Sequence, residues 1–291
     1  MTATTADNRL TLAAQYMVLS ALGFALMGAL VKLAGARGFP VLEIIAARAL
    51  ISLGISAWDA RRKGIDLLGT HRGLLFARGF VGFLALMCVY TSVIHLPLAE
   101  ATLLQYTHPI FTVLFALVAL GENVSRNTLI CIALSLMGLL VVIQPDTFFG
   151  GGKAALHPTY TALGLLGAAG SGAAYVIVRK LAPIEDSSVI ILYFPLVCLP
   201  AAILLGWETF VIPAGIDWLI LLGVGVFTQL GQWGLTKGLA LHNAGAVVAF
   251  SYIQVPIAGL LGVLLFSETP SITTAIGGAL IILGALLNSK R

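Results

Sequence analysis

Two stretches of the chain, LAEATLLQYTHPIFTVLFALVALGE at residues 98–122 and NAGAVVAFSYIQVPIAGLLGVLLFSE at residues 243–268, carry the same landmarks in the same order. Each begins with an alanine-rich segment, continues to a Pro-Ile pair and ends at a glutamate. The proline and the glutamate are thirteen residues apart in the first stretch and twelve apart in the second. Hydrophobic composition alone would make the stretches alike, but it would not preserve this order. The chain therefore contains an internal repeat.

The composition excludes a soluble enzyme. Of the 291 residues, 59% are hydrophobic and 10% are charged, whereas a soluble domain has about 25% charged residues. The mean hydropathy is +1.03. Abundant Leu, Ile, Val and Phe exclude a disordered chain, and the 32 glycines show no three-residue period of the collagen type. The remaining class is a protein that crosses a membrane several times.

Ten apolar runs are long enough to cross a bilayer, which needs about 20 residues per helix. They are Leu12–Val31, Val41–Trp58, Gly73–Val93, Leu98–Leu120, Asn127–Gln144, Thr159–Leu181, Ser187–Gly206, Ile216–Lys237, Ala244–Ser267 and Ser271–Asn288. The repeat unit is five spans, and five is odd, so the halves are expected in opposite orientations. We predict one all-helical membrane domain built from two inverted repeats, residues 1–148 and 149–291.

The distribution of Lys and Arg predicts the orientation. If the N-terminus is inside, eleven of the sixteen basic residues fall on the inner side, three on the outer side and two within spans. Cytoplasmic loops carry an excess of Lys and Arg. Both termini are therefore expected in the cytoplasm, and the protein in the bacterial inner membrane. The net charge of +4 reflects this bias and does not indicate nucleic-acid binding.

With these features the chain resembles the EamA family of the drug/metabolite transporter superfamily. The resemblance rests on spans arranged five plus five, each half with an alanine-rich helix start, a mid-helix proline and a Gly-Glu turn. It covers nearly the whole chain and implies a basket-shaped bundle with a central cavity that exports small metabolites. Within the family, the overall character is most similar to bacterial amino-acid exporters. The second half departs from the pattern, with Ser267 in place of Gly121 and no arginine matching Arg48.

Polar residues at membrane depth are candidates for substrate binding, because each needs a partner or water. Gln105 and His108 are expected on one helix face, and Pro109 and Pro256 are candidate hinges because proline removes a helix bond. Hydrogen bonding between helices with a packing kink is the alternative, and Trp233 suits an interfacial aromatic belt equally well. The predicted substrate-binding residues are Tyr90, Gln105, His108, Tyr175, Gln229, Gln232, Trp233, Tyr252 and Gln254.

The charged residues are expected to have structural roles. Arg48 is expected to pair with Glu43, although five residues of separation place them only loosely on one face, and a position facing the cavity is the alternative. Arg78 lies within two turns of the inner end of its span and is expected to reach the interface. Glu122 and Glu268 stand before the fifth and tenth spans, where a carboxylate can accept backbone N–H bonds of the following helix.

Several absences narrow the chemistry. The spans carry no carboxylate near the midplane, the chain has no Walker A pattern, and the three cysteines lack metal-ligand spacing. No metal or cofactor is therefore expected. His108 is the only mid-span group that could exchange a proton near neutral pH. A pocket of amides, aromatic rings and hydroxyls suits neutral or zwitterionic solutes.

The sequence thus predicts a secondary transporter rather than an enzyme. It would export small metabolites, with aromatic or other neutral amino acids as the first choice, by alternating access of its two halves. Its partners would be the substrate and the lipid bilayer, and a complete inverted repeat would work as a monomer. A drug or nucleotide-sugar carrier on the same fold is the alternative. An intramembrane protease is poorly supported, because the chain has no His-Glu-x-x-His and no Gly-x-Ser-x-Gly.

Overall fold

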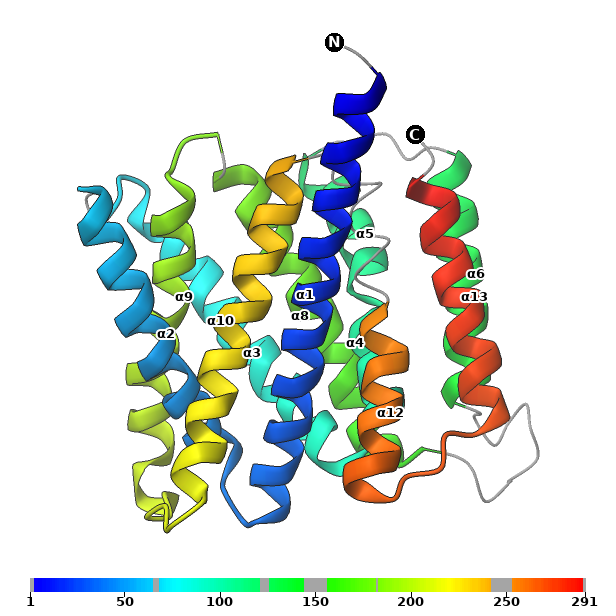
Figure 1. Ribbon diagram of the computed structural model, residues 1–291. Coiled ribbons are helices and arrows are strands. Elements are labelled where there is room, and N and C mark those ends of the chain that lie inside the picture. Colours follow the sequence, from blue (N-terminus) through cyan, green and yellow to red (C-terminus); the bar gives the residue numbers. More distant parts are fainter. Residues whose placement is uncertain are drawn as a thin grey trace.

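The computed structural model describes residues 3–64, 68–120, 126–143, 156–181, 183–241 and 253–289, and every regular element in these ranges is a helix. The helices stand side by side in one bundle (Figure 1). They are α1 (Ala3–Ala36), α2 (Val41–Lys63), α3 (Arg72–His95), α4 (Leu98–Gln105), α5 (His108–Leu120), α6 (Arg126–Ile143), α8 (Pro158–Leu181), α9 (Ser187–Gly206), the short 3-10 helix η1 (Trp207–Thr209), α10 (Asp217–Leu241), α12 (Gln254–Phe266) and α13 (Ile272–Ser289).

The helices have the length and composition of membrane spans. In the described part of the chain, seven stretches are long and apolar enough to cross a membrane, and two shorter apolar helices cover Gln254–Phe266 and Ile272–Gly284. The protein is therefore a multi-pass membrane protein. A count of ten spans and cytoplasmic termini stay predictions.

The packing of the helices repeats between the two halves. Helix α1 packs on α10 as α8 packs on α3, and α1 contacts α12 as α8 contacts α5. Helix α2 contacts α9, and α6 contacts α13, so each of these pairs joins matching members of the two repeats. Among the described helices, these contacts of the first half are thus repeated in the second half.

Glycines allow the principal helix pairs to approach closely. A Cβ atom added to Gly234 on α10 would lie 2.6 Å from the carbonyl oxygen of Tyr16 on α1. At the equivalent crossing, a Cβ atom added to Gly167 on α8 would lie 3.0 Å from the backbone nitrogen of Val89 on α3. Small residues at such crossings are typical of membrane helix packing.

Polar contacts tie the halves together at the end of the bundle where α1 finishes. Lys32 forms an ion pair with Glu268, and Glu268 Oε2 also accepts the backbone N–H of Leu98 at 2.8 Å. The prediction that Glu268 caps the following helix is therefore wrong. Ser271 has that role, since its hydroxyl accepts a backbone N–H of the first turn of α13 at 3.1 Å. Glu122, its counterpart in the first half, lies outside the described residues.

The two halves are also joined just before the start of α3. Glu185, in the loop between α8 and α9, accepts hydrogen bonds from the Thr70 hydroxyl at 2.6 Å, the Thr70 backbone N–H at 2.8 Å and the His71 backbone N–H. Hydrogen bonds from the Thr70 hydroxyl and the His71 backbone lower the pKa of Glu185 to about 2. The Glu185 carboxylate is therefore ionised near neutral pH, and in that form it binds Thr70 and His71.

This contact should make stability depend on pH in the acid range. A depressed pKa stabilises the folded state above the ordinary glutamate pKa of about 4.3, and that contribution is lost as the pH falls from there toward 2. Glu185→Gln should lower the Tm of the detergent-solubilised protein at neutral pH, and the difference should shrink progressively below about pH 4.3. Glu208→Gln, at an exposed position of η1, is the control. A Tm difference that stays constant across this range would contradict the assignment.

Candidate functional site

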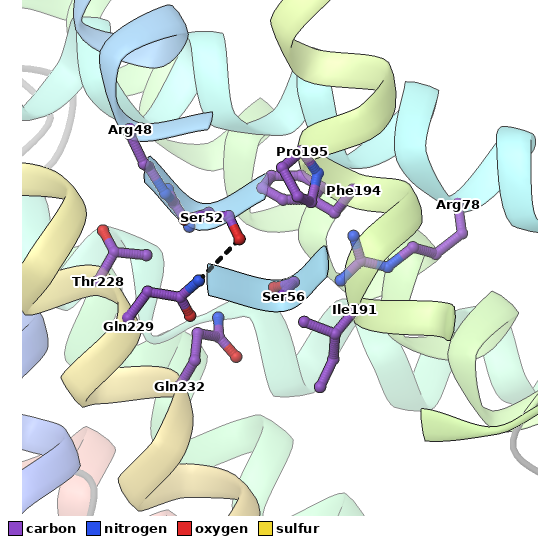
Figure 2. Close-up of a pocket in the computed structure, with 10 residues that line it drawn as sticks. All are labelled: Arg48, Ser52, Ser56, Arg78, Ile191, Phe194, Pro195, Thr228, Gln229 and Gln232. Atoms are coloured by element: carbon purple, nitrogen blue, oxygen red, sulfur yellow. Dashed lines mark hydrogen bonds between the residues drawn. The ribbon is translucent and has the colours of Figure 1, made fainter. Parts of the chain in front are cut away.

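A cavity lies between the two halves, enclosed by α2 and α3 of the first and α9 and α10 of the second (Figure 2). Its volume is about 30 Å³, which is room for water but not for a metabolite. A bound metabolite would therefore require the surrounding helices to separate. The lining residues are Arg48, Ser52, Ser56, Arg78, Ile191, Phe194, Pro195, Thr228, Gln229 and Gln232.

Arg48 enters the cavity from α2 and is 8% exposed. Its Nη1 donates a hydrogen bond to the hydroxyl of Tyr90 at 2.9 Å, and that hydroxyl lies 3.5 Å from Met27 Sδ. The predicted pair with Glu43 is wrong, because the Glu43 carboxylate accepts the backbone N–H of Val211 at 2.8 Å. Positions five apart on a helix point in different directions, which explains why the two side chains diverge.

Arg78 enters the same cavity from α3, so the prediction that it reaches the interface is also wrong. Its Cζ lies 4.7 Å from the centroid of the Phe194 ring, and Arg48 Cζ lies 5.5 Å from that centroid. Figure 2 shows the two arginines approaching from different sides of Phe194. A Cβ atom added to Gly82 on α3 would lie 2.8 Å from the same ring. Glycine at this position therefore lets the ring approach the helix that carries Arg78.

Two of the predicted binding residues, Gln229 and Gln232, line the cavity from α10. Gln229 Nε2 donates to the Ser52 carbonyl oxygen at 3.1 Å, which fixes its amide against α2 (Figure 2). A third predicted residue, Tyr90, is 1% exposed and borders the cavity through its bond with Arg48. The cavity thus joins predicted neutral groups to two cations: Arg48, for which a cavity-facing position was the alternative, and Arg78, which was expected elsewhere.

The fourth predicted span is in fact two helices, α4 and α5, separated by Tyr106 and Thr107. The Thr107 backbone N–H and hydroxyl both donate to the Leu104 carbonyl oxygen, at 3.1 and 2.6 Å, and close a turn. The break comes just before Pro109, which places the proline in the first turn of α5, where its missing N–H removes no helix bond.

The break separates residues that were predicted to share one face. Gln105 is the last residue of α4 and His108 is the first of α5, so no continuous helix aligns them. The His108 ring packs on Tyr175 of α8, with centroids 5.1 Å apart. Its Nδ1 atom is buried and has no hydrogen-bond partner among the described residues. Tyr175 is 43% exposed, although its ring faces His108.

A hydrogen bond between the halves lies at the same break. Tyr106 donates through its hydroxyl to Gln254 Oε1 at 2.9 Å. Gln254 is 7% exposed and begins α12, and Pro256 is the third residue of that helix. The two proline-bearing segments therefore meet where each starts a new helix.

One predicted residue, Trp233, is not brought to these groups. Trp233 packs edge-to-face on Tyr16 of α1, with centroids 5.4 Å apart, and is 49% exposed. Tyr252 lies outside the described residues. Trp233 is thus half exposed and is not among the residues that line the cavity.

Both halves of the sequence match a known family of membrane proteins. The model of the EamA-like transporter family matches residues 11–144 and 159–290. The chain belongs to the EamA-like transporter family. The two matched ranges correspond to the two halves recognised in the sequence, and the family resemblance stated from the sequence is confirmed.

Several named proteins are similar to the chain. It is 32% identical over 274 residues to the pseudopaline exporter CntI of Pseudomonas aeruginosa, covering 94% of each protein. It is 26% identical to the riboflavin transporter of Vibrio cholerae, covering 93% of this chain and 90% of the other. It is 28% identical to solute carrier family 35 member G1 of Mus musculus, covering 92% and 75%.

A solved crystal structure shares the fold of this EamA-like protein, with a TM-score of 0.63, 21% identity and coverage of 92% and 95% of the two chains. The family and the named relatives are transporters rather than enzymes. None of these three relatives is named as an amino-acid exporter, so amino acids stay a prediction for this chain.

Sequence reasoning missed most of the residues that line the cavity, among them Arg78 and Phe194, and it also missed Tyr106 at the α4–α5 break. A signal for the arginine was present, because an ionisable residue within a span faces the bundle interior or a cavity by default. Phe194 carries no such signal, since an apolar ring in an apolar span is unremarkable. Tyr106 lies in a turn that hydropathy does not detect.

Proposed function

We propose that this protein is a secondary transporter that exports small metabolites from the bacterial cytoplasm by alternating access. The observation that carries the proposal is the polar, charged cavity enclosed by two helices from each repeat. Membership of the EamA-like family and similarity to an exporter support the direction of transport. The same helix contacts recur in the two halves, with α1 on α10 matching α8 on α3. This repetition supports two inverted halves, residues 1–148 and 149–291, that work together in one monomer.

The position of the cavity supports loading from the cytoplasm. Ser56 and Arg78 lie in the parts of α2 and α3 that are nearest to the loop joining them. The Lys and Arg distribution predicts that this loop is cytoplasmic. At the other end, the Lys32–Glu268 pair closes the bundle. A metabolite would enter from the inner side, and separation of this pair would release it outside.

The breaks in the helices are the proposed hinges. The α4–α5 turn before Pro109 and the start of α12 before Pro256 are joined by the Tyr106–Gln254 hydrogen bond. Backbone rotation at such breaks lets one half rock against the other without disrupting whole helices. Amino acids are the proposed substrates, and a drug or nucleotide-sugar carrier is the alternative.

Cross-linking tests the mechanism directly. In a background with the three native cysteines replaced by alanine, Lys32→Cys with Glu268→Cys joins the halves across the closed end. Oxidation should stop efflux of labelled metabolites from preloaded proteoliposomes, and reduction should restore it. The control pair, Asp59→Cys with Lys63→Cys, lies one turn apart within α2 and should leave efflux unchanged. Undiminished efflux after oxidation of the Lys32→Cys/Glu268→Cys protein would refute alternating access at this end.

The preloaded mixture also tests the substrate class. It should contain amino acids, sugars, organic acids and a cationic dye, and efflux should be selective for one class. Selective amino-acid efflux would support the first choice. Efflux of the dye or of a nucleotide sugar alone would favour the alternative, and no efflux of any component would count against export.

A further inference from the structure

The cavity holds two cations without a carboxylate to balance them. Arg48 and Arg78 both line it, and no aspartate or glutamate is among the lining residues. Among the described residues, the ion pairs involve other basic side chains: Lys32, Arg37, Lys63 and His71. A buried charge without a counter-ion is unfavourable in a membrane bundle, and ionisable residues there mark substrate pathways.

Unused hydrogen-bond donors accompany the charge. Nε and Nη1 of Arg78 are buried and have no hydrogen-bond partner in the described part of the chain, and the same holds for the Ser52 hydroxyl. Both residues line the cavity. Buried donors are nearly always satisfied in proteins, so three such atoms beside one cavity call for a ligand or water that accepts hydrogen bonds.

Both arginines lie against the same aromatic ring. Both guanidiniums contact the Phe194 ring, with Cζ–centroid distances of 4.7 Å for Arg78 and 5.5 Å for Arg48. A contact with a ring does not use the N–H hydrogen bonds of a guanidinium, so Nε and Nη1 of Arg78 stay available for an acceptor, while Arg48 already donates Nη1 to Tyr90. Close approach of the ring depends on Gly82, where a Cβ atom would lie 2.8 Å from it.

We infer that Arg48 and Arg78 form a carboxylate-binding site, and that the exported metabolite is a small carboxylate anion or carries a free carboxylate. The inference rests on the proposed export function and names its substrate class. A carboxylate matches the bidentate geometry of guanidinium, and the Gln229 and Gln232 amides supply neutral polar contacts beside it. Amino acids meet the requirement through their carboxylate, whereas a cationic drug does not.

Binding to the detergent-solubilised full-length protein tests the inference with probes of matched length. Succinate carries two carboxylates, succinamate one and succinamide none, while butane-1,4-diamine is cationic and inorganic phosphate is a different anion. Ligand-induced shifts in Tm should follow the order succinate, succinamate, then succinamide with no shift. Phosphate binding without carboxylate binding, or binding of the diamine, would overturn the inference.

Substitution of the arginine provides the second arm. Arg78→Gln should weaken succinate binding by about ten- to a hundred-fold, the range expected for loss of a charged hydrogen bond. It should also raise the Tm of the empty protein, because it removes an unbalanced buried charge. Arg78→Lys, which keeps the charge, should recover part of the affinity. Arg72→Gln, at an exposed position on the same helix, should leave binding unchanged.

The two proposals fail in different ways. If Arg78→Gln lowers the Tm of the empty protein and leaves succinate binding unchanged, the arginine is structural and the carboxylate site is refuted. If the carboxylates bind as expected but no metabolite leaves proteoliposomes, the site stands and export is refuted. If proteoliposomes export a metabolite without a carboxylate at a rate that Arg78→Gln does not change, export stands and the substrate class is refuted.

Discussion

Gly234→Val should prevent this protein from folding into a stable bundle. Even the first carbon of the new side chain would lie 2.6 Å from the Tyr16 carbonyl oxygen and 2.9 Å from the Ser20 backbone nitrogen. These neighbours are backbone atoms, which cannot move aside as a flexible side chain could. One turn away, the Ser20 hydroxyl donates to the Gly231 carbonyl oxygen at 2.7 Å. Separating α1 from α10 would break this bond too.

The loss should exceed the usual cost of overpacking, about 1–3 kcal/mol. The measurement is the yield of monodisperse protein in detergent, followed by the Tm from tryptophan fluorescence. Gly54→Val is the matched control, because Gly54 lies on α2 with no described atom within 4 Å of an added Cβ. That variant should fold normally. Equal yields and equal Tm values for both variants would show that the α1–α10 crossing is not as tight as described.

Glu268→Ala should produce the second-largest effect. Its carboxylate pairs with Lys32 and accepts the Leu98 backbone N–H at 2.8 Å, while Lys32 also donates to the Leu96 carbonyl oxygen. The two side chains are only 12% and 15% exposed. Removing one partner leaves the other charge poorly solvated, and breaking such a pair costs about 3 kcal/mol.

A double substitution separates the cost of leaving Lys32 unpaired from the net contribution of the ion pair to the free energy of unfolding. Lys32→Met combined with Glu268→Met removes both charges, so the double variant should be more stable than Glu268→Ala and approach the unsubstituted protein. Chemical denaturation in mixed micelles gives the three free energies of unfolding. A double variant less stable than Glu268→Ala would contradict this reasoning.

Most of the helices could be predicted because hydropathy reports length and apolarity directly. Ser187–Gly206 matches α9 at both ends, and its start is fixed locally, since the Asp186 carboxylate accepts the Ser188 backbone N–H at 2.7 Å. The break between α4 and α5 could not be found this way, because the apolar run continues through it. Its cause is a turn that Thr107 closes with two hydrogen bonds.

The site could be predicted only where a residue type already implied its surroundings. The Gln229 and Gln232 amides had to face something polar, and they line the cavity. Arg78 carried a similar signal as an ionisable residue within a span, but its contact with Phe194 depends on how α9 packs against α3. A Cβ atom at Gly79 would lie 2.7 Å from Val197, so glycine there permits that approach. Such a contact joins residues more than a hundred positions apart, and no local pattern reports it.

The two positive charges beside Phe194 have a consequence for the proton gradient across the membrane. A pathway that is positively charged before any cargo arrives repels hydronium and metal cations, as fixed arginines do in water-selective pores. The empty carrier could then cycle without dissipating the proton gradient across the membrane. A bound anionic substrate would neutralise the positive charge of the two arginines. The charge that makes the substrate bind would therefore also lower the electrostatic barrier along its path.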